Sequence, residues 1–398
     1  MKTLTKVLTI TGASLLGLGI VVSAVGLTTS KAFSINEKYE KKTYDFSDSI
    51  KNLDIKESSH DIYFTKSPDS DTHVICFDSD YYKHDVEVSG DTLRIVTDLG
   101  ANQAWYSYVH VGIDIDDINT IKTEIQLPEE EYDRLKIQAS SSCVYTSDMC
   151  TTYSATAPSD AFTFGETIIN LHSGDVCYGA YTNKSLEINT TSGEIDAWNY
   201  SDTVMANASF ESSSGDIEVY NINADNVRYK ASSGSIIIDG TRCATGSVST
   251  SSGEITIKNI ESSEDFMIET SSGEQNITDL KANDIRLTSS SGDIEVNKGD
   301  VTTAIAAKAS SGEIILNDVT TGKLTSASFS GNCNFRNLTV SEEAEIETSS
   351  GEVEGTVIGE YFFTTDTSTG DVEIPAVSKS GVDFKIKTTS GDIEISAK

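Results

Sequence analysis

Apolar and polar residues alternate along most of this chain, and a Ser-Gly or Thr-Gly pair interrupts the alternation at regular intervals. Successive glycines of these pairs lie 19 to 22 residues apart. A fixed period of this length is typical of repeat proteins, in which each unit packs on its neighbours. Taking each glycine as position 0, the series is Gly174, Gly193, Gly215, Gly234, Gly253, Gly273, Gly292, Gly312, Gly331, Gly351, Gly370 and Gly391.

Apolar residues hold fixed places around each glycine. Leu186 and Ile188 stand at positions −7 and −5, Ile255 and Ile257 at +2 and +4, and Ile260 at +7. Period-two alternation predicts strands with one buried face, so each unit contains two short strands and a third bridge near +7. The glycine serves a corner that needs either positive φ or close backbone approach. By the same parity, the Ser or Thr at −1 is predicted to point inward.

Units of this length cannot bury a face alone. Stacked as successive coils, each strand pairs in parallel with its copy one turn away. Propeller blades need four strands per unit, and hairpins need a second turn signal that does not recur. The sequence therefore predicts an all-β protein, a right-handed parallel β-helix (β-solenoid) of about 19–20-residue coils over residues 141–398.

The region before the regular units has a different pattern. "LDIKESSHDIYF" around His60 and "LKIQASSSCVYTSDM" around Ser142 are degenerate units, and strand-like runs lie between them. A stack of strands needs its ends covered, because open edges pair with other chains. Residues 45–140 are therefore predicted to form strand-rich N-terminal coils and an irregular β cap.

The N-terminus carries an uncharged stretch, Val7 to Leu27, within residues 1–30. Its 21 residues match the length that spans a bilayer. This predicts a membrane anchor followed by a linker over residues 31–44 and an extracellular C-terminal body. A signal cleaved after Ala32 is the alternative, and the body is then secreted.

Charge and cysteine content limit the function classes. The formal net charge of −33 argues against binding to nucleic acid, which needs a basic face. The six cysteines, Cys76, Cys143, Cys150, Cys177, Cys243 and Cys333, have no metal-type spacing. We predict that these cysteines are unpaired small core residues, and a Cys143–Cys150 bridge is the alternative.

An N-terminal membrane segment, a region ending "EIQLPEEEYDRLKIQAS" and tandem units of the form L-x-I-x-T-x-S-G-[DE]-I-x-[VI] occur together here. This arrangement resembles a bacterial family of β-strand-repeat surface proteins labelled "putative adhesin", a domain of unknown function. The resemblance covers about residues 45–398. It implies a parallel β-helix outside the membrane, with attachment or envelope-stress roles, and it supplies no catalytic residues.

Position +1 is acidic in ten of the twelve units. Stacked carboxylates about 4.8 Å apart repel each other by roughly 0.9 kcal/mol per pair in water. One interpretation is a solvated acidic ridge whose carboxylates cap the turns. The other is weak binding of divalent cations, with Ca²⁺ on Glu254, Glu274, Asp293 and Glu313 as the candidate site; no other cofactor is predicted.

Candidate catalytic residues are few. The five histidines are scattered, and no metal-protease or nucleophile-elbow motif occurs. The predicted function is therefore a surface scaffold or adhesin-like interaction protein without catalytic activity. A carbohydrate-active β-helix enzyme, of the polysaccharide lyase or hydrolase type, is the first alternative. A weakly divalent-cation-binding envelope protein is the second.

Large aromatic residues concentrate in the first 220 residues, including both tryptophans. Aromatic rings beside polar groups suit contact with a glycan or a protein, and the same rings also fill an irregular core. The candidate ligand contacts are Trp105, Tyr106, Tyr108, Trp198 and Tyr220.

Overall fold

The computed structural model describes residues 39–80, 82–99, 121–147, 161–375 and 381–398. All regular structure in these segments is β, in one sheet of 25 strands. Within them no helix is long and apolar enough to cross a bilayer. The stretch from Val7 to Leu27 lies outside the described residues, so the membrane anchor stays a prediction.

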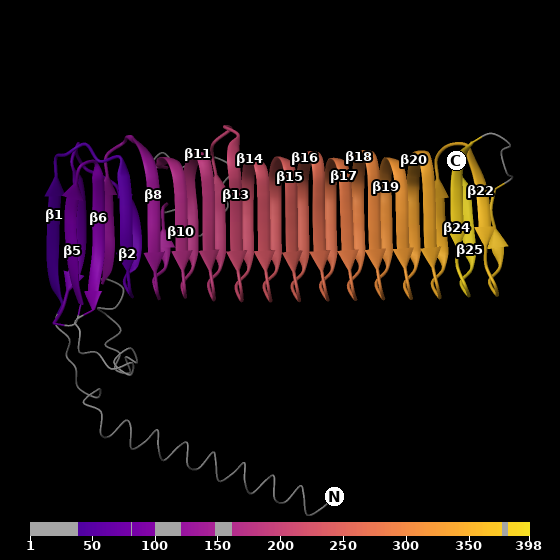
Figure 1. The fold of residues 1–398 in the computed structure, drawn as a ribbon, viewed down its shortest axis with the longest axis horizontal. Coiled ribbons are helices and arrows are strands. Elements are labelled where there is room, and N and C mark those ends of the chain that lie inside the picture. Colours follow the sequence, from indigo (N-terminus) through magenta and orange to yellow (C-terminus); the bar gives the residue numbers. More distant parts are fainter. Residues whose placement is uncertain (1–38, 81, 100–120, 148–160, 376–380) are drawn as a thin grey trace, which may run out of the picture.

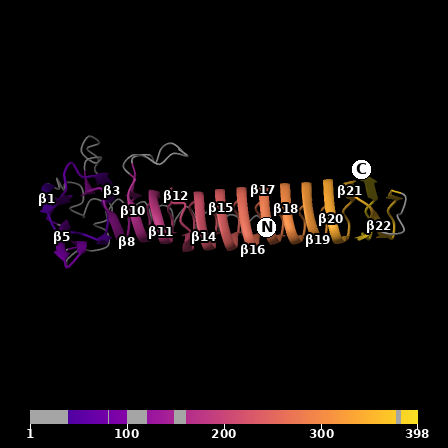
Figure 2. The same ribbon diagram turned by 90° about the horizontal axis from the view of Figure 1, so that it is seen from above.

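Each regular coil is one continuous strand that runs from position +2 of one unit to about −3 of the next. Neighbouring coils pair in parallel, as Ile236 does with Ile255. The coils therefore stand side by side in a single row (Figures 1 and 2), which confirms the predicted parallel β-solenoid; its hand stays a prediction. The body strands are β14 (Ile217–Ala231), β15 (Ile236–Thr250), β16 (Ile255–Thr270), β17 (Gln275–Ser289), β18 (Ile294–Ala309), β19 (Ile314–Ser328) and β20 (Cys333–Thr348).

The predicted inward positions form the core of the stack. In the coil of β16, Ile255, Ile257 and Ile260 at +2, +4 and +7 are almost fully buried. Phe266 and Ile268, at −7 and −5 of the next glycine, close the core from the other side. Burying each such side chain contributes about 1.5–3 kcal/mol relative to exposure. The columns of these residues hold one coil on the next.

The coil bends at position +6, a corner that the sequence analysis missed. Six non-glycine residues there have φ between 54° and 60°, and Gly240 has φ of 80°. Asn and Asp tolerate this left-handed conformation better than most residues, because their short side chains bond locally. The six are Asn221, Asn259, Asp279, Lys298, Asp318 and Asn337.

The glycine corner depends on close backbone approach. A Cβ on Gly273 would lie 1.7 Å from the carbonyl oxygen of Gly253 in the preceding coil. Thr250 at −3 then fixes the corner: its hydroxyl accepts the N–H of Gly253 (3.2 Å) and donates to the carbonyl of Gly234 (3.0 Å). The prediction for position −1 is wrong, because Ser252 is exposed. Alternation does not continue through a tight turn, so the inward hydroxyl is the one at −3.

The N-terminal coils are not stacked in chain order. The first coil, β2 with β3, lies between the coil of β6 with β7 and the coil of β8 with β9. Antiparallel pairs, β1–β4, β4–β7 and β5–β6, occur only in this predicted irregular cap. The strands are β1 (Glu40–Phe46), β2 (Asn52–Glu57), β3 (Asp61–Lys66), β4 (Thr72–Asp78), β5 (Tyr82–Ser89), β6 (Thr92–Leu99), β7 (Lys122–Leu127), β8 (Glu131–Ala139) and β9 (Val144–Tyr145).

The C-terminal end repeats this arrangement. Strand β24 pairs with both β20 and β22, and β25 pairs with both β21 and β23. The last coil of the chain is therefore inserted before the coil of Gly370, and the C-terminus lies inside the row (Figure 1). The remaining strands are β10 (Thr163–Leu171), β11 (Val176–Thr190), β12 (Ile195–Asn199), β13 (Met205–Ser212), β21 (Val353–Val357), β22 (Tyr361–Asp366), β23 (Val372–Glu373), β24 (Val382–Lys387) and β25 (Ile393–Ala397).

Among the five cysteines in the described residues, pairing differs from the prediction at one position, and Cys150 lies outside these residues. Cys76, Cys143, Cys243 and Cys333 are free thiols, as predicted. Cys177 is disulfide-bonded, so its prediction as an unpaired core residue is wrong. It stands at +3 and is buried, with 5% of its surface exposed. Because Cys143 is free, the alternative Cys143–Cys150 bridge is excluded as well.

Candidate functional site

Short side chains at position +1 cap the neighbouring corner. An oxygen of Asp175, Asp216 or Asp293 accepts the backbone N–H of the +1 residue one coil further on, at 2.7–2.9 Å. Asn332 makes the same bond to the N–H of Glu352. Glutamates reach other groups, and Glu254 accepts from Thr256 and Asn276. Capping of the corner amides offsets part of the repulsion within the column.

The four predicted cation ligands lie in this column on successive coils. Glu254 and Glu274 are exposed, whereas Asp293 and Glu313 are half-buried. Burial and the charges of Asp293, Glu354 and Glu295 raise the pKa of Glu313. The described residues contain one group of three or more His, Cys, Asp or Glu side chains close enough to share a metal ion, and it lies elsewhere. Cation binding by the ridge stays a prediction.

Carboxyl groups also stand close to one another around Asp196, beside the N-terminal end of the ridge. Burial and the charges of Glu194, Glu218 and Asp175 raise the pKa of Asp196 from 3.8 to about 7. The pKa of Glu194 is also raised, by burial and by the charges of Glu218, Asp175 and Asp216. Asp196 is therefore partly protonated near neutral pH, a state that a general acid requires.

Two of the five predicted aromatic contacts lie together. The rings of Trp198 and Tyr220 stack with centroids 5.3 Å apart and an interplanar angle of 3°. Trp198 is only 7% exposed, so it does not present an open platform to a ligand. The other three, Trp105, Tyr106 and Tyr108, lie outside the described residues.

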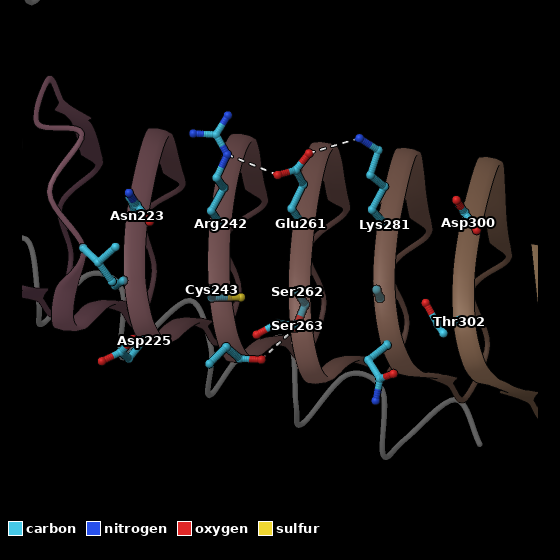
Figure 3. Close-up of a pocket in the computed structure, with 15 residues that line it drawn as sticks. Asn223, Asp225, Arg242, Cys243, Glu261, Ser262, Ser263, Lys281, Asp300 and Thr302 are labelled. Atoms are coloured by element: carbon cyan, nitrogen blue, oxygen red, sulfur yellow. Dashed lines mark hydrogen bonds and ion pairs between the residues drawn. The ribbon is translucent and has the colours of Figure 1, made fainter.

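A groove of about 650 Å³ runs across the coils of β14 to β18. Positions +8, +9 and +10 of each coil line it, with small residues such as Ala224 and Ser262 at +9. Arg242, Glu261 and Lys281 follow one another along one edge (Figure 3). Glu261 accepts from Arg242 Nε and from Lys281 Nζ, both at 3.2 Å. The groove therefore keeps the same spacing from coil to coil, while the charge at its +8 edge changes from one coil to the next.

Titratable groups in the groove are not tuned for chemistry at neutral pH. Burial raises the pKa of the Cys243 thiol to about 11, against a smaller opposing effect of the Ser262 hydroxyl. A thiol with this pKa is a poor nucleophile at neutral pH. The Lys281 hydrogen bond lowers the pKa of Glu261, burial opposes it, and Arg242 adds to the lowering. Glu261 is therefore ionised and paired, which suits binding better than acid catalysis.

A buried polar cluster in the cap was missed by sequence reasoning. We call Glu57, Asp78, His84, Thr97 and Thr123 the cap network. Glu57 Oε2 lies 3.2 Å from His84 Nε2, and Asp78 Oδ1 lies 2.8 Å from His84 Nδ1. Thr97 donates to Glu57 Oε1 at 2.6 Å, and Thr123 donates to Glu57 Oε2 at 3.0 Å. The side chains of Glu57 and His84 are fully buried.

The two central groups of the cap network, Glu57 and His84, favour each other's charged forms. Burial favours the neutral form of Glu57, but the hydrogen bonds and charge of His84, with Thr97, outweigh it and hold the pKa at about 2. Burial also opposes protonation of His84, yet Glu57 and Asp78 raise its pKa above 6.5. Glu57 and His84 are 27 residues apart in the sequence, and no known motif has this spacing. The sequence showed only that each of these two residues lies two positions from an apolar residue of its strand.

Comparison with known proteins defines the family. Residues 50–206, 201–317 and 298–398 each match the model of Toastrack DUF4097, and together the matches cover residues 50–398. The chain belongs to the Toastrack family. This membership confirms the resemblance drawn from the repeats, and the three overlapping matches show that this Toastrack protein extends the same module along one stack.

Two solved structures resemble this Toastrack protein. One is a putative adhesin from Bacteroides fragilis, with 11% identity and a TM-score of 0.25, covering 90% of this chain and 97% of its own. The other is a putative cell adhesion protein from Clostridium sporogenes, with 8% identity and a TM-score of 0.16, covering 91% and 100%. No curated protein matches the chain. TM-scores this low support no inference about function. The function is therefore argued from the residues of the site.

Proposed function

We propose that this Toastrack protein is an exported, membrane-tethered surface scaffold that binds a partner without catalysing a reaction. The observation that carries the proposal is the uninterrupted stack from β14 to β20, whose strands are all 15 or 16 residues long. No inserted loop of these coils builds a closed pocket; the stack instead presents a long, open groove. The uncharged stretch from Val7 to Leu27 is the proposed tether.

An extended chain is the ligand shape that fits this groove. Equivalent positions recur about every 4.8 Å, so a ligand with repeating polar units can make similar contacts on several coils. The paired charges of Arg242, Glu261 and Lys281 offer donors and acceptors in alternation. A surface glycan is the first class to test, and an extended peptide is the second. The net charge of −33 disfavours nucleic acid.

A glycan screen with a turnover assay tests the proposal. The full chain, purified in a mild detergent, is exposed to cell-wall and host glycans, and both binding and newly formed chain ends are measured. We expect binding without turnover. Replacing Arg242 and Lys281 together by Ala should weaken binding by about tenfold or more. Lys258→Ala is the matched control, because Lys258 is exposed on the same body but does not line the groove. Turnover of any glycan would refute the scaffold function.

A carbohydrate-active enzyme is the second candidate, and one observation favours it. Asp196, with a pKa of about 7, stands beside Glu194 and Glu218 and two residues from the Trp198–Tyr220 stack. Glycoside hydrolysis requires a protonated carboxylic acid paired with an ionised one. If the screen detects turnover, Asp196→Asn should abolish it and Glu261→Gln should not. Turnover unaffected by Asp196→Asn would exclude this site.

A further inference from the structure

We propose that Glu57, His60 and His84 form a zinc site that fastens the first coil to the cap. The three residues offer one carboxylate oxygen and two imidazole nitrogens, all within 4.8 Å of one another. All three are buried. Two histidines and one glutamate are a donor set that Zn²⁺ uses in proteins, with a fourth position for water or a hydroxyl.

The geometry of His84 fits a metal ligand as well as an ion pair. Its Nδ1 lies 2.8 Å from Asp78, a normal distance for a charged hydrogen bond, whereas its Nε2 lies 3.2 Å from Glu57. Two ligand atoms on one tetrahedral zinc, each bonded at about 2.0–2.1 Å, stand roughly 3.4 Å apart. The Nε2–Oε2 separation is therefore close to that of two zinc ligands. Asp78 occupies the place of the carboxylate that orients a metal-bound histidine.

Packing holds the imidazole of His60 beside this pair. Its ring stacks on Tyr82 with centroids 5.3 Å apart and lies 5.4 Å from the ring of His84. The Thr123 hydroxyl, 3.0 Å from Glu57 Oε2 and 3.4 Å from His84 Nε2, provides an oxygen next to the open fourth position. The ligands are therefore pre-positioned by strands β2, β5 and β7 and by the corner after β2.

Charge also favours a divalent ion. Two carboxylates, Glu57 and Asp78, face His84 in the cluster. Zinc would replace the Nε2 proton of His84 and so bring one more positive charge to these carboxylates. Burial strengthens this attraction, because the interior screens charge less than water does. The site joins the first coil to β5, so zinc would hold together segments that are distant in sequence.

Zinc titration of the full chain tests the proposal. After treatment with a chelator and its removal, the detergent-purified chain should bind one zinc per chain with Kd on the order of 1 µM or tighter. At 100 times Kd, the folded-to-unfolded ratio should rise about 100-fold. The variants Glu57→Gln and His60→Phe should each weaken binding strongly, and Asp78→Asn should weaken it about 10–100-fold.

His73→Ala is the matched control. His73 also lies between two carboxylates, Asp45 at 2.7 Å and Asp69 at 3.0 Å, but at the surface of the cap. Its loss should leave zinc affinity unchanged. Because buried variants can fail to fold, the wild-type chain labelled with ¹⁵N-histidine locates the metal independently among its five histidines. Zinc should shift the imidazole signals of His60 and His84. Absence of zinc binding, or shifts confined to other histidines, would overturn the proposal.

Discussion

The regular body and the two ends of this solenoid are stabilised in different ways. In the body, from β14 to β20, every coil repeats the same contacts with its two neighbours, so stability is a sum of similar interfaces. At each end, the first or the last repeat coil of the chain is inserted out of chain order and has a coil on both sides. Chain ends fray easily when they have one neighbour, and this arrangement gives each terminal coil two. At the C-terminal end the outermost coil is that of Gly370, an internal segment; at the N-terminal end β4 and β5 cover the coil of β6 with β7, and β1 pairs with β4 at the outside.

The same contrast applies to carboxyl groups. Among the stacked coils outside the cap, burial and neighbouring carboxylates raise the pKa values of Asp196 in β12 and of Glu313 in the body. In the cap, Glu57 stands against His84, and its pKa is lowered to about 2. Ionisation is therefore unfavourable at Asp196 and Glu313 and favourable at Glu57, and within the body it is also favourable at Glu261, which pairs with Lys281 and Arg242. The sign of the contribution is set by the partner that the fold supplies.

Removing residues 381–398 should have the largest effect. Strands β22 and β23 pair with β24 and β25, so the coil of Gly370 should unfold together with the deleted coil. Burial of Phe384, Ile386, Ile393 and Ile395 contributes roughly 6–12 kcal/mol before the entropy of ordering is subtracted. Hydrogen exchange should show loss of protection in β22 and retention in β18. Continued protection of β22 would contradict the inserted position of the last coil.

Gly273→Ala should break the body at one coil. The new Cβ would lie 1.7 Å from the carbonyl oxygen of Gly253, so the backbone of two coils must separate. We expect a loss of about 4 kcal/mol or more in the free energy of unfolding, measured by urea denaturation. Gly299→Ala is the control, because its Cβ meets side-chain atoms at ordinary contact distances of 3.4–3.5 Å. Its effect should stay within about 1 kcal/mol.

The cap and the coil of Asp196 should respond differently to pH, and most clearly below pH 4.5, where only the cap loses stability. Glu57 has a pKa of about 2 in the folded chain and an ordinary value of 4.5, so its stabilisation is complete above 4.5 and is lost as the pH falls toward 2. The pKa of His84 is raised above 6.5, so its contribution is complete below 6.5 and is lost as the pH rises through the folded value. The cap should be most stable between pH 4.5 and 6.5.

Lowering the pH should stabilise the fold around Asp196, whereas it destabilises the fold around Glu57. The pKa of Asp196 is raised from 3.8 to about 7, so the surrounding coil should gain stability as the pH falls from 7 to 3.8. Protection factors in β2 and β12, measured with a chelator present, should separate the two regions. Glu57→Gln should cost the cap about 3–5 kcal/mol at pH 6, because it leaves His84 without one charged partner. Asp196→Asn should remove the pH response of β12. Protection that falls in both strands, or in neither, as the pH drops below 4.5 would contradict the assignment.

How far the sequence predicts this structure depends on whether a feature is repeated. The inward columns were predicted because Ile255, Ile257 and their equivalents recur in every unit. The +6 corner carried a signal that was overlooked, because Asn, Asp or Gly occupies it in six of the seven positive-φ positions, with Lys298 as the exception. The stacking order of the end coils has no local signal, since the last coil has the same repeat pattern wherever it inserts. The cap network could not be found, because its contacts join residues that no period relates.

The smallest predicted effect concerns the acidic ridge, where the cation-binding interpretation remains to be tested. Capping by Asp293 relieves part of the repulsion, and the raised pKa of Glu313 indicates that part of it persists. If Ca²⁺ binds the ridge weakly, each independent site should add about 0.4 kcal/mol at a Ca²⁺ concentration equal to Kd. The melting temperature should then rise more with Ca²⁺ than with Na⁺ at equal ionic strength.

Replacing Glu254, Glu274 and Glu313 by Gln and Asp293 by Asn should remove most of this Ca²⁺-specific increment. The fold should persist, because an Asn at +1 can cap the next coil as Asn332 does. A matched quadruple variant at Glu269, Asp284, Asp300 and Glu347, acidic residues outside the +1 column, removes the same charge and should keep the increment. Equal responses to both salts in the wild-type chain would leave the ridge as a solvated surface. In that case the capping bonds and water alone offset the repulsion between coils, and the body would need no ion to hold its carboxylates in register.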